Sequence, residues 1–288
     1  MNYDSIYIAP AGVKGYAYIG SLLYLNKYID IYNLKKYIGS SSGSIIVFLI
    51  CVGLPLDKIV KTILDINLNE NLNHNLLLNL YNKKGFYSSN YIINLIKKLL
   101  YKFNILENIK FKDIEFNLNI IASDITNKRL FIFNKKNTPN ALIVDHAIKS
   151  SISIPLFFEP VIYKEMLLID GGFFNMFKID IIDKNTLCLE TSGDLIKDNI
   201  SSEYNLKNYI LLLLNSVFNN KSKSKLLNYN KIEFNINMLG TNFNLNLQDK
   251  RNIINIGIET TIIFCNKRIL LNRYFNLLKY HMSVAVST

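Results

Sequence analysis

The chain has 288 residues, of which 50% are hydrophobic and 19% are charged, so it can bury a substantial core and is not a disordered chain. Its formal net charge of +11 favours anionic partners, such as anionic lipid or nucleic acid. The three cysteines, Cys51, Cys188 and Cys265, are far apart and form no C-x-x-C pair, which argues against a disulfide scaffold or a zinc site and suits a reducing compartment.

The sequence shows no targeting or membrane-spanning segment. The first apolar stretch, residues 6–11, is short, contains Pro10 and lacks the basic lead-in of a signal peptide. The longest apolar run, residues 45–56, is too short for a transmembrane helix, which needs about 20 residues. We therefore expect a cytoplasmic protein whose contact with membranes, if any, is peripheral.

The first part of the chain alternates short apolar strands with helices. The predicted elements are a strand at residues 5–9, a glycine turn at 10–15, a helix at 16–28, a strand at 34–38 and an entirely apolar helix at 44–52. Gly53 and Pro55 then mark the end of the last helix. This alternation predicts a parallel sheet covered by helices.

The rest of the chain continues the mixture of strands and helices. We predict a helical leucine stripe within residues 56–80, a helix at 91–103, strands at 116–123 and 129–133, a helix at 146–153, a hairpin at 161–169 with its turn at Lys164 and Glu165, a strand at 186–190, a helix at 204–218, a strand at 232–237 and a long helix within 247–280. No internal repeat or linker interrupts this series. We expect one domain over residues 1–288, with a motif-bearing core at 5–183 and further strands and helices at 184–288.

One short motif predicts a nucleophile. Gly39, Ser41 and Gly43 form a G-x-S-x-G pattern between a predicted strand and a predicted helix. Such a serine sits on a sharp turn, where the residues two before and two after it crowd each other and are best without a Cβ. The serine-rich composition is also typical of a flexible linker, but linkers are not normally bracketed by hydrophobic segments.

A serine nucleophile needs a base, and the usual base is histidine. The chain has three histidines, His74, His146 and His281. The first two fall at positions typical of exposed polar residues. His281 would complete a Ser–Asp–His order of the α/β-hydrolase kind, although in that fold the nucleophile follows several strands, whereas Ser41 follows only about the second.

Asp170 is the stronger candidate for the base. It ends the apolar strand predicted at residues 166–169, and Gly171 and Gly172 follow it, so the backbone there can turn sharply and approach other groups closely. An Asp-Gly pair alone is a common turn. Its significance comes from its combination with the two glycine turns upstream.

Three blocks of the sequence, taken in this order, resemble the patatin-like phospholipases. Residues 8–15 are similar to that family's glycine-rich oxyanion loop, residues 39–43 to its nucleophile elbow and residues 170–172 to its D-G-G/A motif. Weaker similarities lie at residues 122–126 and 150–161, and the resemblance covers residues 5–183 well. It implies a three-layer α/β/α fold with a mainly parallel central sheet.

The resemblance also implies an activity, that of a phospholipase A-like serine lipid acyl hydrolase that needs no cofactor and no metal. Ser41 would attack a fatty-acyl ester, and Asp170 would take its proton. The remaining expected site residues are the oxyanion and substrate-binding residues Ala11, Gly12, Val13, Lys14 and Ser42, and the elbow and turn glycines Gly39, Gly43, Gly171 and Gly172. The expected partner is a phospholipid or another acyl lipid.

The oxyanion loop departs from the family pattern, because Pro10 and Ala11 stand where glycines are usual. Proline has no N–H to donate, and alanine tolerates a positive φ poorly. An alternative is therefore a catalytically impaired relative that binds lipid. A nucleic-acid binder rests only on the net charge, because the chain lacks an interleaved basic and aromatic motif, and we expect no nucleic acid.

Overall fold

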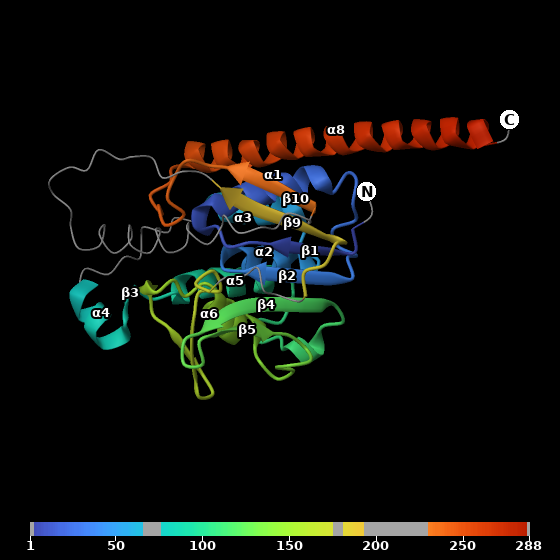
Figure 1. Cartoon of the computed structure of the whole chain (residues 1–288). Helices are drawn as coiled ribbons and strands as arrows, with labels where there is room; N and C mark the ends of the chain where they lie inside the picture. Colours follow the sequence, from blue (N-terminus) through green and yellow to red (C-terminus); the bar gives the residue numbers. More distant parts are fainter. Residues whose placement is uncertain (1–2, 66–75, 175–180, 193–229, 287–288) are drawn as a thin grey trace.

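The computed structural model describes residues 3–65, 76–174, 181–192 and 230–286. Eight strands of this part form one sheet: β1 (Ser5–Ile8), β2 (Lys36–Ser40), β4 (Asn117–Asp124), β5 (Arg129–Phe133), β7 (Val161–Tyr163), β8 (Met166–Ile169), β9 (Thr186–Ser192) and β10 (Asn230–Asn235). The order is β10-β9-β1-β2-β4-β8-β7, with β5 beside β4. The run from β10 to β4 is parallel, whereas β5, β7 and β8 pair antiparallel. The predicted mainly parallel sheet is confirmed (Figure 1).

The middle of the sheet determines where a site can form. β1 and β2 are parallel neighbours, and Ile8 pairs with Gly39 in register. The carboxyl ends of parallel strands open at the same edge of a sheet, where α/β proteins place their ligands. The turns that follow these two strands therefore lie next to each other.

The helices are α1 (Tyr16–Leu25), α2 (Ser42–Cys51), α3 (Leu56–Asp65), α4 (Leu76–Lys83), α5 (Asn90–Lys102), α6 (Lys149–Ser151) and α8 (Leu247–Val286). α8 packs along α1, and its C-terminal half extends beyond the rest of the molecule (Figure 1). One hydrophobic cluster joins Ile6 and Ile8 of β1 to α1, α2, α5 and α8, so these helices cover one face of the sheet.

The opposite face of the sheet is also buried. Tyr7 of β1 alternates with Ile6 and Ile8 and belongs to a second cluster, which contains Ile38, Ile121 and Ile182. The helix predicted at residues 204–218 lies outside the described residues. The fold is a mixed α/β fold with helices flanking a central multi-strand sheet, as expected.

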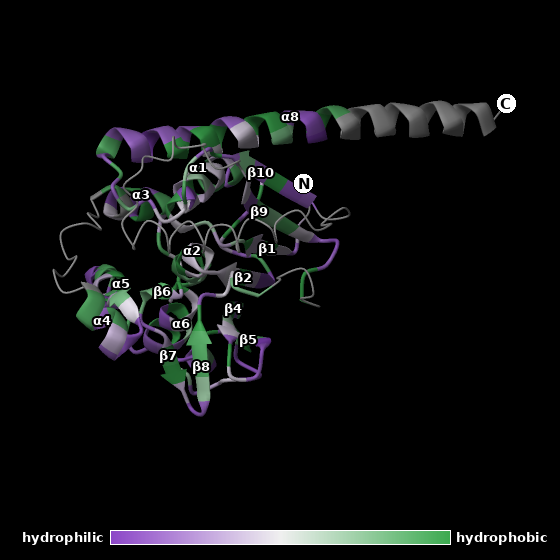
Figure 2. Cartoon of the chain, turned by 60° about the vertical axis from the view of Figure 1, so that its left-hand side comes forward, coloured by the Kyte–Doolittle hydropathy of each residue, from purple (hydrophilic) through white to green (hydrophobic). Residues whose placement is uncertain are grey.

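Most predicted elements are present with shifts of a few residues at their ends. The hairpin is confirmed as β7 and β8, which are hydrophobic strands joined by a hydrophilic turn (Figure 2). Of the leucine stripe predicted within residues 56–80, the first part falls in α3 and the last part in α4, while residues 66–75 lie outside the described residues. The helix predicted at residues 146–153 begins earlier, as a π-helical turn at Ile143–Ile148 that leads into α6. The sequence did not indicate the small parallel sheet of β3 (Gly85–Tyr87) and β6 (Leu156–Phe158).

The single domain stays a prediction, and the packing supports it. The larger hydrophobic cluster contains Ile6 near the N-terminus together with Ile253 and Cys265 of α8. The predicted motif-bearing core and the C-terminal elements therefore share one core in the part of the chain that the structure describes.

Candidate active site

Ser41 lies on a sharp bend between the end of β2 and the start of α2. Its φ of 52° and ψ of −130° are unusual for a residue with a Cβ and are adopted only where the surrounding structure imposes them. The neighbouring glycines permit this bend. A Cβ on Gly39 would lie 2.7 Å from the carbonyl oxygen of Gly43, and a Cβ on Gly43 would lie 2.2 Å from that of Ile8. The predicted strand–turn–helix around the G-x-S-x-G motif is confirmed.

The start of α2 provides a positive electrostatic environment for Ser41. The first amides of a helix have no acceptor within it, and no side chain caps this end of α2. The unpaired N–H groups and the positive end of the helix dipole therefore face the turn that carries Ser41. The Oγ atom of Ser42, the first residue of α2, is buried and has no hydrogen-bond partner among the described residues.

Ser41 and Asp170 are in direct contact. The Ser41 hydroxyl donates a hydrogen bond of 2.6 Å to Oδ2 of Asp170, and only 5% and 2% of these residues are exposed. Burial raises the pKa of Asp170 to about 6, while hydrogen bonds from Ser41 and from the Gly172 amide act in the opposite direction. This shift brings the pKa of the carboxyl group closer to neutral pH, which makes the carboxylate a stronger base than that of an exposed aspartate.

The turn after β8 holds Asp170 in place through backbone groups. The Asp170 amide donates to the carbonyl oxygen of Ser153 at 2.8 Å, and the Gly172 amide donates to Oδ1 of Asp170 at 2.7 Å. Gly171 permits close packing, because a Cβ there would lie 2.2 Å from the carbonyl oxygen of Ile121. One carboxylate oxygen is thus fixed by the turn, which leaves the other for Ser41.

Ser151 lies between Ser41 and the aspartate turn, a position that the sequence did not indicate. Its hydroxyl accepts a hydrogen bond of 2.9 Å from the Ser41 amide and donates one of 2.6 Å to the carbonyl oxygen of Ile121. Its own carbonyl oxygen accepts from the Gly171 amide at 3.1 Å. Ser151 therefore connects the nucleophile turn to the aspartate turn. The similarity at residues 150–161 was the only signal that pointed to this stretch.

His146, whose side chain the structure describes, makes its contacts away from Ser41. Nδ1 of His146 accepts a hydrogen bond from the Leu142 amide at 3.0 Å, and its ring packs against Tyr163. His74 and the side chain of His281 lie outside the described residues. The Ser41 hydroxyl donates its proton directly to the carboxylate of Asp170 in a hydrogen bond.

The loop after β1 lies beside this pair. Gly12 has a φ of +56°, whereas Ala11 has a φ of −147°, so the one residue with positive φ in this loop is a glycine. Ala11 therefore does not adopt the positive φ that alanine tolerates poorly. The amides of Ala11 and Gly12 donate to no acceptor among the described residues and remain candidates for holding an oxyanion.

Val13 differs from its expected role. Its amide donates to the carbonyl oxygen of Gly240 at 2.8 Å, so in this arrangement it is not free to bind an oxyanion, although Val13 does line the pocket. Lys14 is buried, which lowers the pKa of its ammonium group, and it is not among the pocket-lining residues. Lys14 is thus not a solvent-exposed lysine, and its contact with a substrate stays a prediction.

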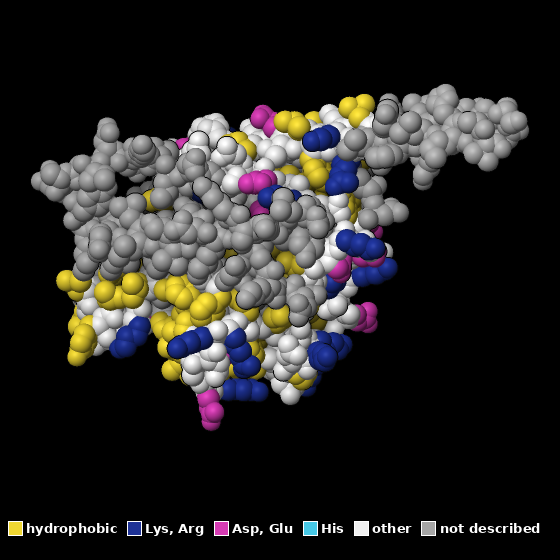
Figure 3. Space-filling model, viewed as in Figure 1, with side chains coloured by type: hydrophobic (Ala, Val, Ile, Leu, Met, Phe, Trp, Pro, Cys, Tyr) yellow, Lys and Arg dark blue, Asp and Glu magenta, His cyan; other side chains and the backbone are white. Residues whose placement is uncertain are grey.

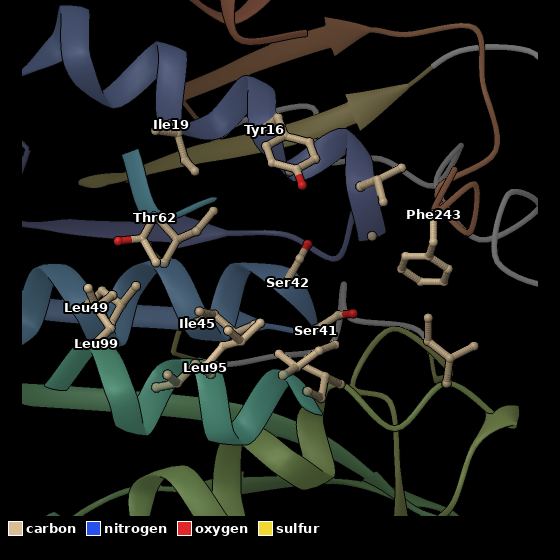
Figure 4. A pocket seen from close by; sticks show the side chains of 18 of the residues that line it. Tyr16, Ile19, Ser41, Ser42, Ile45, Leu49, Thr62, Leu95, Leu99 and Phe243 are labelled. Carbon is tan, nitrogen blue, oxygen red and sulfur yellow. The ribbon is translucent and has the colours of Figure 1, made fainter. Parts of the chain in front are cut away.

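A hydrophobic pocket of about 150 Å³ opens beside Ser41. Leu49 and Leu99 lie at one end of it, and Ser41 and Phe243 lie at the other (Figure 4). Its walls come from the oxyanion loop, α1, α2, α5 and the residues around β6, and the polar side chains among its lining are Tyr16, Ser41, Ser42 and Thr62. The pocket matches an apolar chain attached to a group that reacts at Ser41.

The described residues offer neither a cluster of metal ligands nor a helix that could cross a membrane. No three His, Cys, Asp or Glu side chains of this part come together as a metal site would require. None of its helices combines the length and the hydrophobicity needed to span a bilayer.

Comparison with known proteins identifies the family to which the sequence is similar. Residues 11–183 match the patatin-like phospholipase family. The chain is 29% identical over 234 residues to a probable lipid hydrolase of Invertebrate iridescent virus 6, covering 74% of this chain and 78% of that protein. It is 27% identical over 270 residues to an uncharacterized protein of Acanthamoeba polyphaga mimivirus, covering 88% of this chain and 90% of that protein.

Two solved structures share the fold. VipD from Legionella pneumophila superposes with a TM-score of 0.63 at 15% identity, covering 93% of this chain and 67% of that chain. ExoU, a type III effector protein of Pseudomonas aeruginosa, superposes with a TM-score of 0.54 at 13% identity. That match covers 93% of this chain but 53% of ExoU, so this chain spans about half of that protein.

Proposed function

Because this chain belongs to the patatin-like phospholipase family and is an ester-bond hydrolase that acts on lipids, we propose that Ser41 and Asp170 are its catalytic dyad. The hydrogen bond of 2.6 Å between the Ser41 hydroxyl and the buried Asp170 carboxylate is the observation that carries this proposal. The resulting activity is phospholipase A-like hydrolysis of fatty-acyl esters through an acyl-enzyme.

Acylation begins with proton transfer. Asp170 takes the proton of the Ser41 hydroxyl as Oγ attacks the ester carbonyl carbon. The negative charge that develops on the carbonyl oxygen is held by the amides of Ala11 and Gly12 and by the amide at the start of α2, at Ser42. The carbon–oxygen bond to the alcohol then breaks, the alcohol oxygen takes the proton from Asp170, and the acyl group stays on Ser41.

Deacylation repeats these steps with water. Asp170 removes a proton from a water molecule, whose oxygen attacks the acyl carbon while the same amides hold the oxyanion. The bond to Ser41 Oγ breaks, and the proton on Asp170 returns to the serine, so the free fatty acid leaves and the dyad is restored.

The pocket supports an acyl-lipid substrate. Ile45, Ile96 and Leu99 are among its lining side chains, and a saturated chain placed there would lose its contact with water. The similarity to a probable lipid hydrolase points to the same substrate class.

The exposed surface of α4, whose Leu80 packs in the same cluster as the pocket residue Phe158, supports peripheral contact with a lipid bilayer. Leu77, Leu78 and Tyr81 of α4 are 66%, 57% and 80% exposed. Hydrophobic side chains gather over α4 and the neighbouring surface, with basic side chains nearby (Figure 3), and Lys83 and Lys84 follow two residues after Tyr81. Exposed apolar and cationic side chains together favour an anionic lipid surface.

Lysines of α5 contribute less to such a basic surface, because not all of them are free. Lys97 forms an ion pair of 2.7 Å with Asp145, whereas Lys98 and Lys102 are exposed. The lysines of the run at residues 221–225 lie outside the described residues.

A catalytically impaired lipid-binding protein is the second candidate function. Pro10 has no N–H, and the N–H of Val13 is engaged by Gly240, so the loop has fewer free donors than its length suggests. Loss of a single oxyanion donor typically costs about 10²–10³ in rate.

An esterase assay with long-chain acyl substrates, together with labelling by a fluorophosphonate probe, separates the two functions. The hydrolase predicts turnover and labelling of the wild-type protein, and loss of both in Ser41→Ala. Asp170→Asn should reduce turnover by about 10³-fold or more, whereas Ser153→Ala, whose hydroxyl donates to the carbonyl oxygen of Lys149 and to no other described residue, serves as a control. Wild-type protein that binds liposomes but is never labelled would indicate the impaired relative.

A further inference from the structure

The segment that joins β10 to α8, residues 236–246, contacts the oxyanion loop. The carbonyl oxygen of Gly240 accepts the hydrogen bond from the Val13 amide. The two backbones touch without a side chain between them, since a Cβ on Gly12 would lie 2.1 Å from the Gly240 oxygen and a Cβ on Gly240 would lie 2.8 Å from that of Ala11. This contact joins parts of the chain more than 200 residues apart.

Three residues later the same segment contacts the opposite wall of the pocket. The ring of Phe243 lies 4.8 Å from that of Phe157 and 6.2 Å from that of Phe158, measured between centroids. Phe243 and Phe158 both line the pocket, and Phe243 is at the same end as Ser41 (Figure 4). The segment therefore links the oxyanion loop to the aromatic wall around β6.

Both ends of this segment are anchored. The amide of Ile236 donates to the carbonyl oxygen of Ser192, at the end of β9, at 2.8 Å. At the other end, Asn246 and Asp249 cap α8 reciprocally, with side chain to backbone hydrogen bonds of 2.9 and 3.1 Å. A short connection between two fixed elements can hold a partner loop in a defined position.

We propose that residues 236–246 act as a clasp with two separate effects on the site, an inference that rests on the proposed function. Gly240 is a positioning residue, which fixes the oxyanion loop through the Val13 amide so that the amides of Ala11 and Gly12 stay directed at the reacting carbonyl. Phe243 is a specificity-determining residue, because it closes the pocket beside Ser41 and limits the acyl chains that fit. Since Pro10 contributes no donor, the position of the remaining amides matters more in this chain.

The first test is Gly240→Ala, whose new Cβ must displace the Ala11 carbonyl. We expect kcat to fall about tenfold or more on esters of every chain length while KM stays within about twofold, because the loop acts on the transition state. Asn244→Ala, an exposed position in the same segment, is the matched control and should retain wild-type kcat. An unchanged kcat in Gly240→Ala would overturn the positioning role.

The second test is Phe243→Ala, with p-nitrophenyl esters from butyrate to palmitate. We expect the kcat/KM ratio of palmitate to butyrate to change about tenfold or more, with Phe243→Leu restoring most of the wild-type ratio. Phe131→Ala, a partly buried ring packed against Phe133 and Tyr163 outside the pocket, controls for a general loss of stability. Parallel profiles of wild type and Phe243→Ala would overturn the specificity role.

Two readouts that need no turnover separate a failure of the clasp from a failure of the hydrolase. Hydrogen exchange at the Val13 amide should be slow in the wild type and faster in Gly240→Ala. Binding of a fluorescent fatty acid should weaken or change its chain preference in Phe243→Ala. A wild-type protein without esterase activity would count against the hydrolase alone, whereas unchanged exchange and binding would count against the clasp.

Discussion

The backbone amide of Ser41 donates to the hydroxyl of Ser151 at 2.9 Å, and this hydroxyl in turn donates to the carbonyl oxygen of Ile121. The strained turn that carries Ser41 is therefore tied to β4 by one serine side chain. All three groups are buried, so none of them can exchange its partner for bulk water.

Replacing Ser151 by alanine should lower both stability and activity. The change removes the hydrogen bonds that the Ser151 hydroxyl makes with the Ser41 amide and the Ile121 carbonyl oxygen, and a buried group left unpaired typically costs about 1–3 kcal/mol of unfolding free energy. We expect kcat to fall about tenfold because the Ser41 turn loses its support. Denaturant unfolding and steady-state kinetics measure the two effects. Wild-type kcat in a destabilised variant would show that Ser151 has only a structural role.

The pH dependence of activity should follow Asp170. Because its pKa is raised to about 6 and the base must be ionised, kcat/KM should fall below that pH, by about tenfold per unit. A pH–rate profile on a soluble ester measures this. A profile that stays flat down to pH values of about 4 would contradict a base with this pKa.

The same carboxylate should cost stability at neutral pH. Its pKa is raised in the folded state, so the folded protein binds more protons than the unfolded chain between about pH 4 and 6, and stability falls as the pH rises through that window. Asp170→Asn, which removes the buried charge, should therefore raise the unfolding free energy at pH 7 by about 3 kcal/mol while it abolishes turnover. The gain should disappear at about pH 4. Equal stability of the two proteins at neutral pH would argue against a buried, ionised carboxylate.

Gly43 at the start of α2 and Gly53 just after its end should respond differently to replacement by alanine. A Cβ on Gly43 would lie 2.2 Å from the Ile8 carbonyl oxygen in β1, so Gly43→Ala should destabilise the fold by about 3 kcal/mol or more. Gly53 has a φ of +78° but open space around it, so Gly53→Ala should cost only about 1 kcal/mol. Thermal unfolding compares them, and similar costs would show that the close approach of Gly43 to β1 does not require a glycine there.

The exposed face of α4 should matter for bilayers and not for soluble substrates. Leu77→Glu combined with Leu78→Glu should lower binding to anionic vesicles and activity on them about tenfold, while hydrolysis of a soluble short-chain ester remains at the wild-type rate. Ile263→Glu, a change at a residue of α8 that is 69% exposed, is the matched control. Unaltered vesicle binding of the double variant would exclude this face.

Local chemistry made much of the site predictable. The requirement for small residues around a strained serine indicated Ser41 with Gly39 and Gly43, and Asp170 followed from an apolar strand that ends in two glycines. The spacing of hydrophobic residues located most strands and helices, because an element with one buried face repeats its hydrophobic residues with its own period. The short strands β3 and β6 gave no such pattern, since three residues are too few to show a period.

What the amino-acid sequence determined by itself was a set of local geometries: a tight turn at Ser41, a second one after Asp170, and a loop in which one glycine can take a positive φ. Only the tertiary structure decided which groups meet. The contact of Ser41 with Asp170, the bridging role of Ser151 and the use of the Val13 amide by Gly240 all join segments more than 100 residues apart. Such contacts depend on the order of strands in the sheet and on where their connections return, and neither is encoded in the spacing of neighbouring residues.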